Sequence, residues 1–461
     1  MYKTAIFLVF CIPLFAVVTQ VTAQAEEPEA QLVWAKSAGG TSEDHLGSPS
    51  QSGSGWGCPQ TVAALAGGGA VVSGTFRDIA TFGHGGLNET VLVAAGECDI
   101  FVAKYNTDSS LAWAKRAGSP EEDYSFAVAA LSDGSSVVTG SFRGRALFGQ
   151  GEANETAFDE DYPSSLLIRM FVAKYNPDGT LAWAKASHAA TDDPRNVRQQ
   201  CTGQALAALA EGGILVTGWC DGAATFGKGE ANETTLAISP SRPFVFAARY
   251  NSDGTLAWAR QAGGYGGSCG KIAAALSDGG AIVCGSYSPP VVFGEGEPNE
   301  TTLPSIPTNA IFLAKYNAEG SLAWVKSLDL FAGDTQRGAY FHVGTLPDGA
   351  FMLTGGFMGA VTFGAAEANE TVLSAEGGYD LFLAKYNSDG SLAWAKRAGG
   401  SKDERGTGIA ALSGDSILVT GTFEGSITFG PGEANETTLS AAGENSIFLA
   451  IYSGNGALAG A

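Results

Sequence analysis

The sequence has 461 residues, a formal net charge of −21 and 64 glycines, and 45% of its residues are hydrophobic. That hydrophobic fraction excludes a disordered chain, and the glycine-punctuated runs of β-forming residues favour an all-β fold. The strongly acidic balance argues against nucleic acid as a partner, because such a protein repels phosphate overall.

The first 25 residues have the features of a secretory signal peptide. Lys3 supplies a short basic region, Ala5 to Val18 form an apolar core, and Ala23-Gln24-Ala25 offers a small-residue cleavage site. No other segment approaches the roughly 18 apolar residues of a membrane span. Removing residues 1–25 takes away Lys3 and no acidic residue, so the charge of −21 becomes −22. We expect residues 26–461 to be secreted, periplasmic or on the cell surface.

One phrase recurs six times along the rest of the chain. It first appears as FVAKYNTDSSLAWAK at Phe101 and last, in a decayed form, as FLAIYSGNGALAGA at Phe448. The tryptophans of the phrase, counted from Trp34, follow one another at intervals of 66 to 79 residues. A period of this size is typical of solenoids, propellers and repeat arrays. The six copies begin at Phe101, Phe171, Phe246, Phe312, Phe382 and Phe448.

Each repeat is predicted to contain four strands. In the first repeat, the first strand is VAAL at Val62, and a glycine turn leads to the second, AVVSGTF from Ala70. A long loop with Phe-Gly and Asn-Glu-Thr precedes the third strand, FVAKY. The third and fourth strands, FVAKY and LAWAK, are joined by Asn-x-Asp-Gly, which is typical of a hairpin turn. Because a lone sheet cannot bury both of its faces, neighbouring repeats are expected to stack.

The two ends of the chain predict a closed ring. LVWAK at Leu32 reads as a fourth strand without its first three, and the C-terminal ALAGA reads as a fourth strand that has lost its tryptophan. We expect the N-terminal strand to complete the last blade. Residues 26–461 would then form a single six-bladed β-propeller of four-stranded antiparallel blades. The alanine-rich first strand suits the crowded axis, so it is predicted to be innermost.

The repeat also resembles a known family. The pattern Gly-x-Phe, Phe-Gly, Phe-x-Ala-Lys-Tyr and Trp-Ala-Lys is carried in the second repeat by Gly140, Phe142, Phe148, Gly149, Phe171, Ala173, Lys174, Tyr175, Trp183 and Lys185. The fifth repeat carries it at Asp380, Phe382, Lys385, Tyr386, Gly390, Trp394 and Lys396. This pattern is similar to the bacterial β-propeller repeats called SBBP. The resemblance implies exported or surface-associated propellers, and it implies no catalytic residues.

Six cysteines remain after the signal peptide, and their positions suggest disulfides. The midpoint between Cys201 and Cys220 falls within two residues of the turn at residues 211–213, so the two are expected to face each other across a hairpin. Cys269 and Cys284 are expected to repeat that geometry, which leaves Cys58 to pair with Cys98. An exported protein favours this disulfide interpretation over the alternatives, which are buried free thiols or a metal site.

Acidic residues cluster in the segments that precede the first strands. If these segments surround the mouth of a central channel, their carboxylates could hold Ca²⁺ or a cationic ligand. The alternative is a solvated acidic face that keeps the protein in solution. Other than a possible Ca²⁺, the sequence predicts no cofactor. The candidate metal ligands are Asp44, Asp123, Asp193 and Asp403.

Each repeat also contains one Asn-Glu-Thr triplet. Each triplet fits the acceptor pattern for N-glycosylation. The alternative is that asparagine shapes the long loop, and the resemblance to bacterial repeats favours this structural role. The asparagines are Asn88, Asn154, Asn232, Asn299, Asn369 and Asn435.

Basic residues recur on the third and fourth strands, including Lys104 and Lys115 in the first repeat. A stripe for nucleic acid is one interpretation. Pairing with nearby acids and stacking on tyrosine and tryptophan rings is the other, and the acidic net charge favours it.

No catalytic motif is present, and we predict a non-catalytic binding or scaffold module. Its ligand would be an extracellular glycan, a cell-wall polymer or a protein, and the protein itself is expected to be a monomer. The repeats differ most from one another at residues 40–58, 157–170 and 185–201, which are predicted to carry specificity. Two alternatives remain open: a calcium-binding, adhesin-like module, and a polysaccharide-active enzyme that uses acidic loops at the channel mouth.

Overall fold

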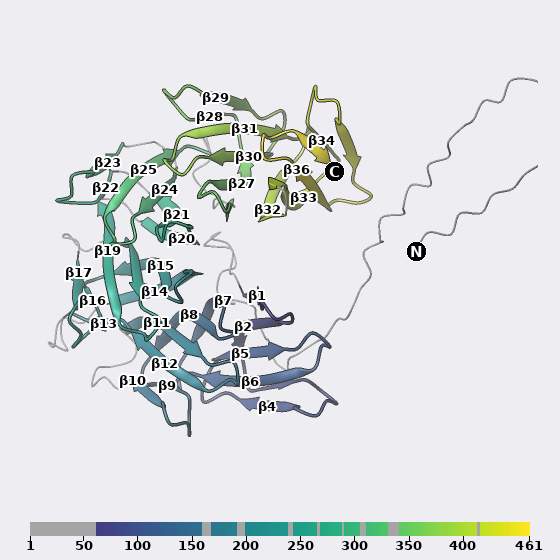
Figure 1. The fold of residues 1–461 in the computed structure, drawn as a ribbon. Coiled ribbons are helices and arrows are strands. Elements are labelled where there is room, and N and C mark those ends of the chain that lie inside the picture. Colours follow the sequence, from purple (N-terminus) through teal and green to yellow (C-terminus); the bar gives the residue numbers. More distant parts are fainter. Residues whose placement is uncertain are drawn as a thin grey trace, which may run out of the picture. The chain divides into compact units, whose positions relative to one another are not determined.

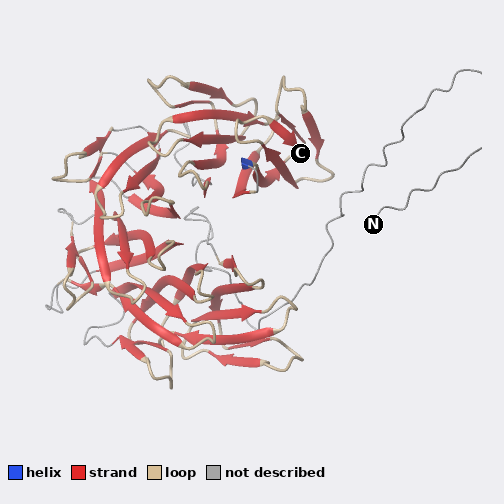
Figure 2. Cartoon of the chain, in the orientation of Figure 1, coloured by secondary structure: helices blue, strands red, loops and turns tan. Residues whose placement is uncertain are grey.

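The computed structural model describes residues 61–158, 167–190, 199–237, 243–264, 268–287, 290–304, 310–330, 341–412 and 415–461. The chain divides into two units, Met1–Ala35 and Lys36–Ala461, and all the described residues belong to the second. Their regular structure consists of β-strands (Figure 2), with a single residue, Asp415, in a 3-10 turn. This confirms the all-β class. Within this part of the chain, no helix has the length and apolarity needed to span a membrane.

Six repeats follow one another along the second unit, and each contains four strands in which every strand pairs antiparallel with the next of the four (Figure 1). The four strands, in order, are β1 (Val62–Ala64), β2 (Ala70–Phe76), β5 (Asp99–Tyr105) and β6 (Leu111–Ala117) in repeat 1. In repeat 2 they are β7 (Tyr124–Ala130), β8 (Ser136–Arg143), β11 (Leu167–Tyr175) and β12 (Leu181–Ala186). In repeat 3 they are β14 (Gln199–Ala208), β15 (Ile214–Asp221), β18 (Phe244–Tyr250) and β19 (Leu256–Gly264).

The second half of the chain repeats this order. In repeat 4 the strands are β20 (Ser268–Ala275), β21 (Ala281–Tyr287), β24 (Ala310–Tyr316) and β25 (Leu322–Leu328). In repeat 5 they are β26 (Phe341–Thr345), β27 (Phe351–Phe357), β30 (Asp380–Tyr386) and β31 (Leu392–Ala398). In repeat 6 they are β32 (Glu404–Ala411), β33 (Ile417–Phe423), β36 (Ser446–Tyr452) and β37 (Leu458–Gly460). The predicted four strands per repeat are therefore confirmed.

The long loop between the second and third strands folds into a two-stranded ribbon, which the sequence analysis did not predict. In repeat 1, Phe82 of the Phe-Gly pair lies opposite Thr90 of Asn-Glu-Thr. The ribbons are β3–β4 (Ile79–Phe82, Thr90–Val93), β9–β10 (Ala146–Phe148, Thr156–Phe158), β16–β17 (Ala224–Phe226, Thr234–Leu236), β22–β23 (Val291–Phe293, Thr301–Leu303), β28–β29 (Ala360–Phe363, Thr371–Ser374) and β34–β35 (Ser426–Phe429, Thr437–Ser440). A short strand, β13 (His188–Ala189), extends the ribbon of repeat 3.

The Asn-x-Asp-Gly segment forms the predicted hairpin. In repeat 2, the amide of Asn176 donates to the carbonyl of Thr180, and the amide of Gly179 donates to the carbonyl of Asn176. The carboxylate of Asp178 accepts from the amide of Thr180 at 3.0 Å. Gly179 has a φ of +88°, a conformation that glycine adopts without the steric cost of a Cβ.

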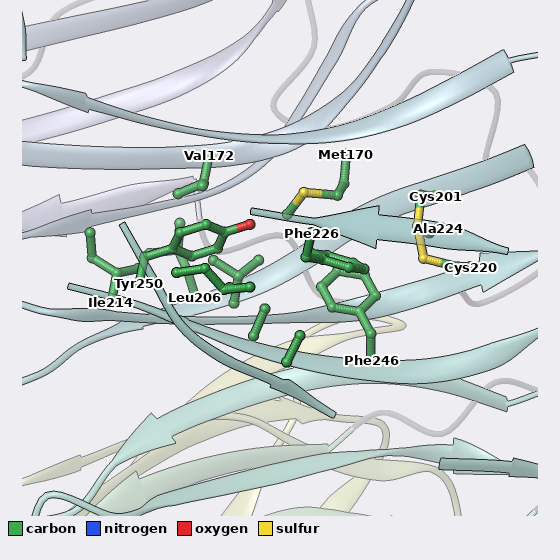
Figure 3. Close-up of a cluster of buried hydrophobic side chains, with 14 of the residues drawn as sticks. Met170, Val172, Cys201, Leu206, Ile214, Cys220, Ala224, Phe226, Phe246 and Tyr250 are labelled. Atoms are coloured by element: carbon green, nitrogen blue, oxygen red, sulfur yellow. A yellow bond between two sulfur atoms is a disulfide. The ribbon is translucent and has the colours of Figure 1, made fainter. Parts of the chain in front are cut away.

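The hydrophobic core lies between repeats. One cluster joins Ile100 and Val102 of repeat 1 to Val128 and Val138 of repeat 2, and all four side chains are buried. Four other clusters join the following pairs of repeats in the same way. Figure 3 shows the cluster between repeats 2 and 3, where Met170 and Val172 lie near Leu206 and Phe246. The prediction that neighbouring repeats stack is confirmed.

At the C-terminus, β37 pairs with β36, with Leu458 opposite Tyr452 and Gly460 opposite Ile451. The C-terminal segment therefore occupies the fourth-strand position of repeat 6. The residues predicted to complete the last blade, 32–36, lie outside the described residues, as do the predicted signal peptide at 1–25 and Cys58. A closed six-bladed ring is not established by the described contacts.

Candidate functional site

The first strands of repeats 1 to 5 line a common, open cavity of about 400 Å³. This confirms that the alanine-rich first strands lie innermost. The lining consists of small or apolar side chains and one hydroxyl, with no titratable group. The lining residues are Ala63, Ala64, Ala129, Ala130, Leu206, Ala207, Ala208, Ala273, Ala275 and Thr345.

Two acidic residues, Asp123 before the first strand β7 and Asp99 at the start of the third strand β5, lie at the junction of repeats 1 and 2, away from the cavity lining. Asp123 is fully buried, and its carboxylate accepts from the amide of Ser119 at 2.5 Å and from the amide of Arg143 at 3.1 Å. Asp99 of repeat 1 is also fully buried and pairs with Arg116 at 2.7 Å. A Cβ placed on Gly118 would lie 2.6 Å from Asp123 Oδ2 and 3.0 Å from Asp99 Oδ1, so both carboxyl groups flank this glycine.

The same arrangement recurs between repeats 5 and 6. Asp380 pairs with Arg397 at 2.8 Å, and the carboxylate of Glu404 accepts from the amide of Gly400 at 2.9 Å. A Cβ on Gly399 would lie 2.3 Å from Asp380 Oδ2, so the glycine leaves space for this carboxyl group. Asp380 and Glu404 occupy the positions of Asp99 and Asp123 in their own repeats.

Burial governs the ionisation of these four carboxyl groups. It raises the pKa of Asp99 to about 6, although the Ala95 amide and Arg116 oppose the shift. Burial, reinforced by the charges of Asp380 and Asp403, raises the pKa of Glu404 to about 7. Burial also raises the pKa of Asp123 and of Asp380.

The predicted metal ligands are not brought together in the described structure. Asp123 is engaged by backbone amides, and Asp403 pairs with Arg405 at 3.0 Å and accepts from the amide of Tyr379. Asp44 and Asp193 lie outside the described residues. Within the described ranges, no group of three or more histidine, cysteine or acidic side chains could hold a metal ion. Asp123 therefore does not point to a channel mouth as expected, because its carboxylate is buried between repeats 1 and 2.

The basic residues of the third and fourth strands hold neighbouring repeats together. Lys115 of repeat 1 pairs with Glu152 of repeat 2 at 2.6 Å, and Lys185 pairs with Glu230 of repeat 3 at the same distance. Lys104 donates to the carbonyl of Pro177 at 3.0 Å, across the same junction. These contacts confirm the prediction of local pairing with acids.

Tryptophan completes each of these junctions. Trp113 donates its indole N–H to the Pro177 carbonyl at 3.1 Å, so it shares this acceptor with Lys104. A Cβ on Gly179 would lie 2.6 Å from Trp113 Cγ, which shows that the ring packs directly on the glycine of the next hairpin. We call the tryptophan, the third-strand base and the receiving hairpin the latch. The same ring-on-glycine packing pairs Trp183 with Gly254, Trp258 with Gly320, Trp324 with Gly390 and Trp394 with Gly456.

The asparagine of each Asn-Glu-Thr triplet fixes the loop to the fourth strand. Asn154 Nδ2 donates to the carbonyl of Leu181 at 3.1 Å, and Thr156 Oγ1 donates to the carbonyl of Asn154 at 3.0 Å. This supports the structural role, because a glycan on Nδ2 would have to share that nitrogen with the hydrogen bond. The corresponding donors in the other repeats are Asn88, Asn232, Asn299, Asn369 and Asn435.

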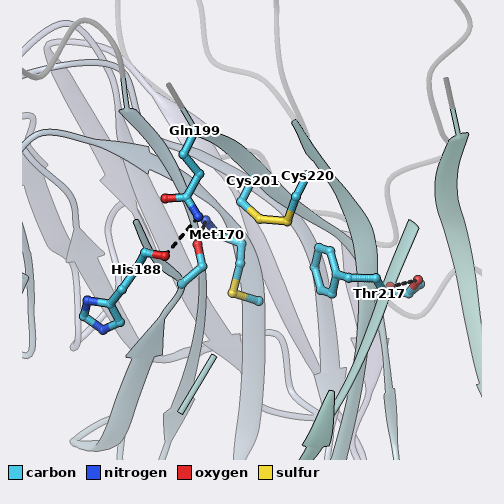
Figure 4. The surroundings of a disulfide bond; sticks show 8 residues. Met170, His188, Gln199, Cys201, Thr217 and Cys220 are labelled. Carbon is cyan, nitrogen blue, oxygen red and sulfur yellow. Dashed lines mark hydrogen bonds between the residues drawn. A yellow bond between two sulfur atoms is a disulfide. The ribbon is translucent and has the colours of Figure 1, made fainter. Parts of the chain in front are cut away.

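The disulfide between Cys201 and Cys220 is confirmed. The two residues lie directly opposite each other on β14 and β15, and Figure 4 shows the bond beside the hydrogen bond from Gln199 to the His188 carbonyl. Cys98 is likewise a free, buried thiol, and it donates to the carbonyl of Asp123, so its expected pairing with Cys58 is wrong; Cys58 itself lies outside the described residues.

The expected disulfide between Cys269 and Cys284 is wrong, because both thiols are free and buried. Cys269 lies opposite Ser286, and Cys284 lies opposite Ile272. The equivalent β14–β15 hairpin has a bulge between Gly203 and Ala205 and still pairs Cys201 with Cys220, so the bulge in β20 is not the cause. Cys269 and Cys284 occupy positions that the register of β20 and β21 does not place opposite each other on either side of the bulge. Burial raises the pKa of the Cys269 thiol to about 12, which keeps it protonated.

No protein-family model matches the chain, so membership of the SBBP-type family stays a prediction. The chain is similar to an uncharacterized WD repeat-containing protein, L264, of Acanthamoeba polyphaga mimivirus, with 22% identity over 400 residues. The match covers 73% of this chain and 27% of the length of that relative. This match is consistent with a chain that is built from repeated β-sheets.

One solved structure that matches is the NanB sialidase of Streptococcus pneumoniae in complex with 2-[(3-chlorobenzyl)ammonio]ethanesulfonate. The match has 10% sequence identity and a TM-score of 0.25, and it covers 85% of this chain and 67% of the sialidase. At this TM-score the two structures superpose too poorly to transfer any property.

Sequence reasoning missed the paired buried carboxyl groups, although the sequence held a signal for them. Asp99 and Asp380 each stand two residues before the phenylalanine of the repeated phrase, and Arg116 and Arg397 stand at equivalent positions on the fourth strand. The other repeats carry different residues at the aspartate position, such as Arg169 in repeat 2. Because the aspartate and the arginine occur together in repeats 1 and 5, their co-occurrence indicates that the two side chains form an ion pair.

Proposed function

We propose that the protein is an exported, six-bladed β-propeller that binds an extracellular glycan, cell-wall polymer or protein as a scaffold module. The observation that carries this proposal is the parallel pairing of β11 with β14, in which Leu167 lies opposite Gln199. Leu167 and Gln199 lie close to the ends of two of the segments in which the repeats differ most, 157–170 and 185–201. Both segments therefore return to the sheets at adjacent positions.

The positions where these two segments rejoin the sheets are held by buried contacts. Arg169 is buried, donates to the Phe158 carbonyl at 3.0 Å and lies over the ring of Phe142 at 4.5 Å. The Cys201–Cys220 disulfide joins β14 to β15 immediately after Gln199. Variable loops on a rigid scaffold are where repeat proteins and other binding folds place their specificity.

The polar residues of the repeat itself support a scaffold role. Its lysines, tryptophans and asparagines bind neighbouring repeats or their own loops. The buried carboxyl pairs carry raised pKa values, as catalytic acids do. However, both pairs are fully buried at junctions, where a polysaccharide does not reach.

A binding array of glycans and cell-wall polymers, probed with residues 26–461, tests this function. We expect binding to one class of polymer. A variant in which the segments 157–170 and 185–201 are replaced by the corresponding residues of repeat 5, except for the residues that belong to β10, β11, β12, β13 and β14, should lose that binding and keep its melting temperature. The matched control replaces the corresponding segment of repeat 4 with that of repeat 5. Equal binding by the two variants would contradict the proposed location, and turnover of a polymer would contradict the non-catalytic role.

A further inference from the structure

The face of repeat 6 that points away from repeat 5 is apolar and exposed. On β36, Ile447 is 75% exposed and Leu449 is 57% exposed. The equivalent residues of repeat 5, Leu381 and Leu383, are each 1% exposed because they pack on repeat 6. The face of repeat 6 thus has the composition of a junction surface. A terminal cap that faces water would instead be polar.

Repeat 1 carries the complementary exposed face. Val62 is 58% exposed, whereas the equivalent Val128 of repeat 2 is fully buried against repeat 1. The first strands of repeats 1 and 5 both line the common cavity, through Ala63 and Thr345. Repeat 1 of the same chain is therefore placed to receive the repeat that follows repeat 5.

The latch residues are missing from both of these faces. On repeat 6, Ile451 stands where Lys104 and its equivalents donate, and Gly460 stands where the tryptophan packs. On repeat 1, Ser109 stands where the other five hairpins have the glycine that receives the tryptophan. Gly86 stands where repeat 2 has Glu152, the partner of the fourth-strand lysine.

Repeat 6 lacks the latch lysine and tryptophan, and repeat 1 lacks the glycine and the glutamate that would receive them. These paired losses are expected if the two faces meet. A tryptophan in the latch position would collide with the Cβ of Ser109, since a Cβ at the five equivalent glycines would lie 2.5 to 2.8 Å from the indole ring. Isoleucine in place of lysine at position 451 adds to the apolar face of β36 a side chain that is 37% exposed. The two faces are thus matched to each other and to no other face of the described repeats.

We propose that the exposed face of β36 docks on repeat 1 of the same chain through apolar contacts alone. We call this junction between repeats 6 and 1 the seam. It lacks the latch contacts of the other five junctions, so it is the junction at which the ring opens. The inference rests on the ring of the proposed function, but it does not depend on which ligand the protein binds.

Chemical cross-linking tests the partner. Leu449→Cys is combined with Val72→Cys in the full chain and treated with a short bis-maleimide, because facing sheets pack about 10 Å apart, too far for a direct disulfide. The control pair is Leu383→Cys with Val419→Cys, which occupies the equivalent positions in the established junction of repeats 5 and 6. We expect both pairs to cross-link within one chain, with a monomer mass by light scattering. Cross-links between chains, or none while the control pair reacts, would overturn the proposal.

Installing the latch tests the seam in a second way. Ser109→Gly and Gly460→Trp are made singly and together, and the melting temperature of each variant is measured. Ser109 has a φ of +68°, so glycine alone is expected to relieve some strain. The double variant should exceed the sum of the two single shifts, because only there can the new indole pack on a glycine. Additive shifts would show that residue 460 does not reach the hairpin of repeat 1. Cross-linking and melting do not depend on any ligand, so they can fail independently of the binding array.

Discussion

Trp113 packs its indole ring on Gly179, and these residues belong to different repeats. The same ring donates its N–H to the carbonyl of Pro177, in the same hairpin as the glycine. The tryptophan of the repeated phrase therefore does not serve its own sheet alone. The tryptophan packs on the hairpin of the next repeat. This contact explains why each tryptophan from Trp113 to Trp394 is followed, in the next repeat, by a hairpin that contains glycine.

This relationship predicts that Gly179→Ala destabilises the protein by about 2 to 4 kcal/mol, from a strained φ and from overpacking against Trp113. The matched control is Gly134→Ala, since Gly134 has a similar φ of +81° but its nearest neighbours would lie 3.7 Å away. Urea unfolding measures both variants at constant m value. Equal losses would mean that backbone strain alone accounts for the effect.

The buried carboxyl pairs predict that the protein is more stable at mildly acidic pH. Their pKa values are raised by folding, to about 6 for Asp99 and about 7 for Glu404, so the folded state binds more protons than the unfolded state. This stabilisation is fully present below the unfolded pKa values and is lost as the pH rises through 6 to 7. We expect the melting temperature to fall between pH 5 and pH 8.

A variant with Asp99→Asn and Glu404→Gln should flatten this pH dependence, because amides do not titrate. Asp108→Asn is the control, since Asp108 is exposed and its pKa is lowered by hydrogen bonds from Ser110. An unchanged pH slope in the double variant would show that other groups cause the dependence.

Reduction of the Cys201–Cys220 disulfide is expected to lower stability by about 3 kcal/mol, from the closure entropy of a loop with a sequence separation of 19 residues. Thermal melting with and without reductant measures this effect, and Cys201→Ser with Cys220→Ser should abolish the difference. Alkylation of the unfolded, unreduced protein should modify Cys269 and Cys284. Recovery of a peptide that links these two residues would contradict the register described above.

Asn154→Asp is expected to cost about 1 kcal/mol, because it removes the donor to the Leu181 carbonyl while it keeps the size of the side chain. Denaturant unfolding measures the loss. The intact mass of the protein after expression in a host that glycosylates Asn-x-Thr tests modification separately. A mass increase that disappears with Asn154→Asp would favour the glycosylation alternative at this site.

Saturating Ca²⁺ is expected to change the stability by less than about 1 kcal/mol, because the carboxylates of Asp123 and Asp403 already have amide and arginine partners. Melting in Ca²⁺ and in chelator measures this change. A ligand present at 100 times its Kd would stabilise the protein by about 2.7 kcal/mol, and such a shift would restore the calcium alternative.

Much of this fold is local, and the sequence by itself determined it. The phrase from Phe101 to Lys115 specifies two strands and a hairpin through alternation and through Asn-x-Asp-Gly, which act over a few residues. The pairing of Cys201 with Cys220 followed from simple counting about a turn, because β14 and β15 keep these two residues in register.

Only the tertiary structure decided what lies between repeats. The pairing register of β20 and β21 places Cys269 opposite Ser286 and Cys284 opposite Ile272, and counting residues about the turn did not fix that register. Asp99 and Asp123 are 24 residues apart in sequence, and they meet because stacking places both beside Gly118. The partner of Trp113 is likewise set by stacking, since burial of apolar faces brings each repeat onto the next and creates contacts that no single repeat contains.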